Sequence, residues 1–163
     1  MQTLNGDLIM ASHAQALKGM SMTRQIVIAP GQVLYRFYDA RRATTPAMGA
    51  NGPWWLELEH FQTVKHFAAR NHYSFSYAVR LFTAILYEWS EVNAFVACRT
   101  TSPLSAWKGR GKQVSSTRKD PRDLPTMTPM QSILEIYQLY IPGLGGTASL
   151  AGQAIQVQSH GAI

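Results

Sequence analysis

The sequence predicts an α+β domain, because helical and strand-like apolar patterns alternate along its 163 residues. The clearest example is the segment from Tyr73 to Arg99. Apolar side chains recur there at every third or fourth position from Phe75 to Trp89, which is the spacing of a helix with one buried face. A run of β-formers follows from Val92 to Cys98. The chain therefore predicts a buried helix that leads into a core strand.

Three further elements surround this pair. Residues 32–38 (QVLYRFY) alternate along their length and predict a strand, and residues 56–70 carry apolar side chains at helical spacing. Residues 133–141 have strand character and end at Pro142-Gly143. Residues 100–129 are interrupted by Gly, Ser and Pro and contain the basic run KGRGK, which predicts an exposed loop.

The elements divide the chain into three parts. Residues 1–30 predict a partly ordered leader, with an edge strand at Gln25–Ala29. Residues 31–143 hold the main elements and predict one domain. Residues 144–163 are rich in Gly, Ala, Ser and Gln and predict a flexible tail.

The composition narrows the class of protein. A hydrophobic content of 46% fits one globular domain, and a single cysteine excludes an internal disulfide. No apolar run has the length of a membrane span, and the first residues lack the basic and apolar regions of a cleaved signal. A net charge of +6 favours anionic partners such as nucleotides, nucleic acid or acidic proteins.

Arg36 is the first candidate site residue, because it lies in the middle of the strand 32–38 between bulky neighbours. A half-buried guanidinium is costly unless it meets an anion. Two interpretations stay open: a structural ion pair, or a clamp for phosphate or ribose oxygens. Downstream, the adjacent Trp54 and Trp55 cannot both enter one core, so we expect one to anchor the core and the other to form the wall of a pocket.

Polar residues near the buried elements supply the other candidates. Ser74 and Ser76 precede or begin the predicted helix, where they can cap it or line a site. Glu135 lies within an apolar strand and requires either Arg36 or a ligand to balance its charge. The histidines lack suitably spaced metal-ligating neighbours, so we expect no metal site.

The order of these features resembles the Arg–Ser–Glu class of mono-ADP-ribosyltransferase toxins, which includes the catalytic domains of cholera and pertussis toxin. The resemblance spans roughly Val33 to Gly143. The matching stretches are Leu34-Tyr35-Arg36, Tyr73-Ser74-Phe75-Ser76, the strand 92–99 and the region from Glu135 to Pro142.

The resemblance implies an ADP-ribosyltransferase-like fold, with two small packed β-sheets around an NAD cleft and flanking helices, as the catalytic domain at residues 31–143. It implies that Arg36 holds NAD, and that Ser74 and Ser76 orient the nicotinamide side. Glu135 would be the catalytic residue, which stabilises the charge that develops on the ribose as nicotinamide leaves. Another register places Gln138 in the catalytic position instead. The aromatic side chain that stacks on nicotinamide would come from Tyr77, Trp54 or Tyr38.

The implied function is that of a bacterial toxin or effector in bacterial competition, a glycosyltransferase that moves ADP-ribose from NAD to a protein or RNA without a metal. Its implied partners are an immunity protein or a delivery chaperone. We expect secretion without a signal peptide and action in the cytoplasm of the target cell. Two alternatives remain: an NAD glycohydrolase toxin, which uses the same residues, and a non-catalytic basic module that binds RNA or protein through residues 108–122.

Overall fold

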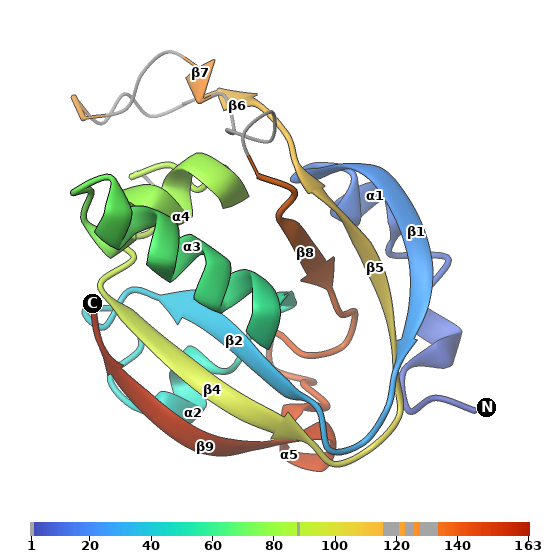
Figure 1. Cartoon of the computed structure of the whole chain (residues 1–163). Helices are drawn as coiled ribbons and strands as arrows, with labels where there is room; N and C mark the ends of the chain where they lie inside the picture. Colours follow the sequence, from blue (N-terminus) through green and yellow to red (C-terminus); the bar gives the residue numbers. More distant parts are fainter. Residues whose placement is uncertain (1, 88, 116–120, 123–125, 128–133) are drawn as a thin grey trace.

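The structure is a computed structural model, and it describes residues 2–87, 89–115, 121–122, 126–127 and 134–163. Its main element is a seven-stranded sheet in which every neighbouring pair is antiparallel, in the order β1-β5-β8-β3-β2-β4-β9 (Figure 1). The α+β class is therefore confirmed. The strands of this sheet are β1 (Met20–Ile28), β2 (Val33–Tyr38), β3 (Trp54–Glu57), β4 (Ala94–Thr100), β5 (Leu104–Gly111), β8 (Tyr137–Tyr140) and β9 (Ile155–Ala162).

The remaining elements are short, apart from two helices. A separate two-stranded ladder pairs β6 (Val114–Ser115) with β7 (Thr126–Met127). The two longer helices, α3 and α4, lie side by side over one face of β2 and β4 (Figure 1). The helices are η1 (Gly6–Leu8), α1 (His13–Ala16), α2 (Pro46–Gly49), α3 (Leu58–Arg70), α4 (Phe75–Thr83) and α5 (Ala151–Ala154).

Strand β3 divides the sheet into two halves. Its first two residues, Trp54 and Trp55, pair with β8, whereas its last two, Leu56 and Glu57, pair with β2. The four-residue strand β3 is therefore the junction between the two halves, and each half pairs with a different part of it. We expected two separate packed sheets, and the structure instead joins the halves into one sheet through this narrow junction.

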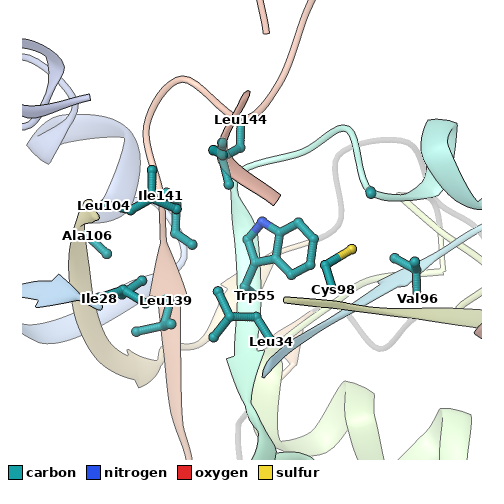
Figure 2. Packing of buried hydrophobic residues seen from close by; sticks show 12 residues of the cluster. Ile28, Leu34, Trp55, Val96, Cys98, Leu104, Ala106, Leu139, Ile141 and Leu144 are labelled. Carbon is teal, nitrogen blue, oxygen red and sulfur yellow. The ribbon is translucent and has the colours of Figure 1, made fainter. Parts of the chain in front are cut away.

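One tryptophan of the Trp54-Trp55 pair lies in the core and the other lines a cavity, as the sequence predicted. The reason is that both lie in a strand. Successive side chains of a strand point to opposite faces of the sheet. Trp55 is 2% exposed, and Figure 2 shows its ring between Leu34, Leu144 and Cys98 in the core. Trp54 faces the other way and lines a cavity. The alternation of the strand therefore separates an anchor from a cavity wall.

A second core lies beneath α3 and α4 and is rich in aromatic side chains. Tyr35 stacks on Phe61 with ring centroids 3.8 Å apart, and Phe37 meets the edge of Phe75 at 5.7 Å. Tyr35 and Phe37 are the β2 residues that face the helices, so Leu34 and Arg36 face the opposite side of the sheet. This alternation directs Arg36 away from the helical layer.

The helix that we predicted from Phe75 to Trp89 is shorter in the structure. Helix α4 ends at Thr83, because Ala84 adopts a left-handed conformation with φ of 56°. The buried Arg80 donates to the carbonyl oxygens of Ile85 (3.1 Å) and Ser90 (2.6 Å). A side chain of the helix thus satisfies carbonyl groups of the loop that follows, so the apolar spacing of the sequence continues where the helix does not.

Two segments that we expected to be loose are parts of the sheet. The segment 100–129, predicted as an exposed loop, contains β5, which pairs with both β1 and β8. The predicted flexible tail contains β9, which pairs with β4 from Ala94 to Thr100. Both predictions were wrong, because turn-forming and small residues are tolerated where neighbouring strands supply the hydrogen bonds.

The leader is packed against the domain as well. The expected edge strand exists as β1, with longer bounds than predicted. Asn5 is fully buried, and its side-chain amide donates to the carbonyl oxygens of Ser105 (2.9 Å) and Pro142 (2.8 Å). Among the residues that the structure describes, no helix has the length and hydropathy needed to cross a membrane.

Candidate functional site

A cavity of about 730 Å³ opens where β2 and β8 diverge from β3. Its size and its mixture of apolar and polar walls are typical of sites for nucleotide-sized ligands. Its walls come from all three strands, from the loop 39–53 and from the loop after α4. Charged, polar and aromatic side chains on its walls include those of Lys18, Arg36, Tyr38, Trp54, Gln138 and Tyr140.

Arg36 projects into this cavity from β2. Its side chain is half-buried, and its Nε atom is fully buried without a hydrogen-bond partner among the described residues. One terminal nitrogen donates to the carbonyl oxygen of Phe37 at 3.2 Å. Desolvation by burial lowers the pKa of Arg36 to about 10, so the group stays charged at neutral pH. No carboxylate in the described part of the chain forms an ion pair with it, which favours a ligand anion over a structural ion pair.

Aromatic side chains form the walls beside Arg36. Tyr38 follows it on the same face of β2, and Trp54 stands on β3. Trp54 meets Tyr140 of β8 edge to face, with ring centroids 4.9 Å apart. Two of the three candidates for a stacking residue, Trp54 and Tyr38, therefore lie in one cavity with Arg36.

Gln138 is the polar residue that β8 contributes to this cavity. It is 6% exposed, and its Nε2 donates to the carbonyl oxygen of Gly19 at 2.8 Å. This bond orients the side-chain amide and leaves its Oε1 as an acceptor. The register that places Gln138 in the site therefore agrees with the geometry.

Glu135, in contrast, lies outside the cavity. Its side chain is 69% exposed, and its Oε1 accepts a hydrogen bond of 2.7 Å from the guanidinium of Arg110 in β5, with which it forms an ion pair. Arg110 also lies beside Tyr137, which neighbours Gln138 on β8 and therefore points to the opposite face of that strand. The expected convergence of Arg36 and Glu135 across one crevice is wrong, because Glu135 belongs to the other face.

The remaining candidates from the helix region do not line the cavity either. Ser74 caps α4 by accepting from the backbone amide of Tyr77 at 3.1 Å. Ser76 donates to the carbonyl oxygen of Glu91 at 3.3 Å. Tyr77 is exposed and meets Tyr73 edge to face at 5.4 Å. The capping interpretation of Ser74 is confirmed, and none of these side chains reaches Arg36.

The loop after α4 forms a cavity wall that we did not expect from the sequence. Trp89 lies in this loop, and its carbonyl oxygen accepts from Arg42 at 2.8 Å. The buried Asp39 accepts from the backbone amide of Glu91 at 3.2 Å and pairs with Arg41 at 3.2 Å. The hydrogen bond from Arg41 is the main reason that the pKa of Asp39 is lowered to about 2. In the sequence, the sign of this contact was Asp39 itself, an aspartate placed directly after a predicted strand.

A group of possible metal ligands lies where β3 continues into α3. Glu57, Glu59 and His60 place possible metal-ligand atoms within 4.8 Å of one another. The ammonium of Lys108 lies 2.6 Å from Glu57, and burial lowers the pKa of His60. Because Lys108 supplies the positive charge at this place, we assign no metal to the group.

Two solved structures are similar to this chain in backbone. One is Tne2, solved in complex with Tni2: the TM-score is 0.50 at 13% sequence identity, over 89% of this chain and 97% of that chain. The other is Rhs1-CT, solved in complex with its cognate immunity protein RhsI1: the TM-score is 0.48 at 11% identity, over 90% and 85% of the two chains. No protein-family model matches the chain, and no curated protein does. At this level of identity, the similarity to Tne2 concerns the fold alone.

Proposed function

We propose that this chain is a bacterial toxin or effector that binds NAD in the cavity between β2, β3 and β8 and cleaves its nicotinamide–ribose bond. The observation that carries the proposal is Arg36, a charged guanidinium in a nucleotide-sized cavity with no carboxylate partner among the described residues. A dinucleotide supplies what Arg36 lacks, since its diphosphate is a strong acceptor for a guanidinium.

The other walls of the cavity suit the rest of NAD. Trp54 and Tyr38 offer aromatic faces for a planar ring, and Gln138 offers an amide oxygen for a ribose hydroxyl. The exposed ammonium of Lys18 adds positive charge on the wall. These groups provide binding at both ends of a molecule that carries two phosphates between two rings.

In the proposed reaction the bond between ribose C1′ and the nicotinamide nitrogen breaks. Nicotinamide leaves with the electron pair, which neutralises its ring, while positive charge develops at C1′. The aligned oxygen of Gln138 stabilises this charge through its dipole. A water molecule then forms the new bond to C1′ and loses one proton to solvent, which gives ADP-ribose.

We propose water rather than a macromolecule as the acceptor. In the resembled toxins, the glutamate region engages both ribose and acceptor, but here Glu135 pairs with Arg110 away from the cavity. Among the described residues, the cavity therefore has no carboxylate from that region that would orient a protein or RNA. Hydrolysis needs only access of water, which an open cavity allows.

The toxin role rests on the resemblance in sequence and on the similarity in fold to Tne2, which has been solved with a second protein. We propose that this chain also has a protein partner, that this partner neutralises it, and that the chain reaches its target cell without a signal peptide. The rival module that binds RNA through residues 108–122 is less well supported. Lys108, Arg110 and Arg122 pair with Glu57, Glu135 and Glu91.

The test is incubation of the purified chain with NAD, followed by chromatography of the products. Hydrolysis predicts nicotinamide and ADP-ribose in equal amounts. A parallel reaction with labelled NAD and a bacterial lysate reports transfer, through label on protein or RNA. Release of nicotinamide with label on a macromolecule would favour transferase activity, whereas no nicotinamide in either reaction would contradict the proposal.

A further inference from the structure

Three side chains on the cavity wall lie against glycines. A Cβ atom built on Gly19 would lie 2.8 Å from the Trp54 ring, and one on Gly49 would lie 2.6 Å from the Tyr38 ring. A Cβ on Gly52 would lie 1.9 Å from the nearest Arg36 nitrogen. All three separations are shorter than real Cβ contacts. The positions of these side chains therefore depend on glycine at three separate places in the chain.

Gly52 has the closest of these contacts. A Cβ there would overlap three atoms of the Arg36 guanidinium at once: one terminal nitrogen, Cζ and Nε, at 1.9, 2.2 and 2.3 Å. The backbone of Gly52 cannot easily retreat, because its amide donates to Ala50 at 3.1 Å and its carbonyl accepts from the buried Trp55 indole at 2.8 Å. An added methyl group must therefore displace the guanidinium.

Arg36 has few other contacts that determine its position. Within the described residues it makes one hydrogen bond, to the carbonyl oxygen of its neighbour Phe37, and no ion pair with a carboxylate. A long side chain with a single weak polar contact is placed mainly by the shape of the space around it. Gly52 forms one wall of that space, and the fully buried Nε shows how closely the wall encloses it.

We infer that Gly52 is a positioning residue: it leaves the space that holds the Arg36 guanidinium toward the cavity, ready for an anionic ligand. The effect on substrate rests on the proposed function, whereas the effect on Arg36 does not. The inference adds a glycine on the loop before β3 to the determinants of binding.

The first test observes Arg36 without any ligand. Nitrogen-15 spectra resolve the Nε–H signal of a buried arginine, and loss of the signal in Arg36→Lys would assign it. We expect this signal to move or broaden in Gly52→Ala. The matched control is Gly152→Ala in α5, where an added Cβ meets no atom within 4 Å and the signal should stay unchanged. An unchanged Arg36 signal in Gly52→Ala would overturn the inference, whatever the chain does to NAD.

The second test measures hydrolysis of NAD by the same variants. A displaced guanidinium predicts a KM raised by about tenfold or more in Gly52→Ala, with kcat within about twofold of wild type, as expected for lost ground-state binding. A merely unstable variant would instead lose kcat through its inactive fraction. A normal KM despite a moved Arg36 signal would contradict the role in binding, and an inactive wild type would contradict the proposed function separately.

A double substitution covers the case in which Gly52→Ala folds poorly. In Arg36→Ala the guanidinium is gone, so adding Gly52→Ala should cost no further thermal stability. Restored stability in the double variant would support the inference, because it would show that the two residues compete for one space. If Gly52→Ala costs the same stability in wild type and in Arg36→Ala, glycine is needed there only for the backbone. That result would overturn the inference.

Discussion

The arginines near β2 and the loop after α4 differ in how their charges are balanced. Around Asp39 and Glu91, the arginines Arg41 and Arg122 pair with carboxylates and join the loop after α4 to the end of β2. Arg36 lies on the same strand end but pairs with no described carboxylate and faces the cavity. Arg41 and Arg122 perform a structural task, and we propose that the charge of Arg36 is available for a ligand.

The largest effect should follow from Arg36→Met. Loss of one partner of a buried, charged hydrogen bond costs about 2–5 kcal/mol, so NAD hydrolysis should fall by at least about 30-fold. Thermal stability should stay level or rise, because a costly buried charge with no carboxylate partner is removed. Nicotinamide release and a melting curve on the same sample measure both effects.

Arg110→Met is the matched control for that variant. Arg110 pairs with the exposed Glu135 on the other face of β8. Hydrolysis should stay within about twofold of wild type, since exposed ion pairs contribute about 1 kcal/mol or less. Equal losses of activity in both variants would show that the loss does not depend on the place of Arg36 in the cavity.

A smaller loss should follow from Gln138→Ala, about tenfold in kcat, because a dipole that acts on the transition state would be missing. Glu135→Gln should leave the rate unchanged, since that side chain is exposed and paired with Arg110. The pair of variants separates the two registers in one assay. Loss of activity in Glu135→Gln alone would restore the acid as the catalytic residue.

The stability that the ion pair between Asp39 and Arg41 contributes should depend on pH. Because the pKa of Asp39 is about 2, below its unfolded value of about 4, its stabilising effect is complete above pH 4 and disappears as the pH falls toward 2. Asp39→Asn should flatten the dependence of unfolding free energy on pH in this window. Arg41 is exposed, so the difference should be no more than about 1 kcal/mol. Urea unfolding at several pH values would reveal it, and identical slopes would show that the pair is screened.

The smallest effect on activity should come from Ser74→Ala. Loss of a helix cap costs about 1 kcal/mol of stability. Because Ser74 caps α4 and does not line the cavity, hydrolysis should be unchanged in the folded variant. A selective loss of activity at normal stability would return Ser74 to the site.

The sequence predicted those features that depend on local chemistry. Arg36 was identified because a guanidinium inside an apolar strand needs an anion, and the two tryptophans because both cannot enter one core. Features that depend on distant partners were missed. The loop after α4 is held by Arg80, which donates to the carbonyl oxygens of residues 85 and 90. The strand β9 is determined by its pairing with β4.

The choice between Glu135 and Gln138 shows the same limit. Alternation along β8 separates the two faces, but the sequence does not state which face meets the cavity. Only the pairing of β8 with both β3 and β5 decides it. The predicted strand began at residue 133, which lies outside the described residues.

Calorimetric titration of ADP-ribose into wild type and Arg36→Met is the most direct test of the central claim, because it measures binding of the diphosphate without turnover. Saturable binding by wild type, weakened by at least about 30-fold in Arg36→Met and unchanged in Arg110→Met, is the predicted result. Equal affinity of wild type and Arg36→Met for ADP-ribose would contradict the account.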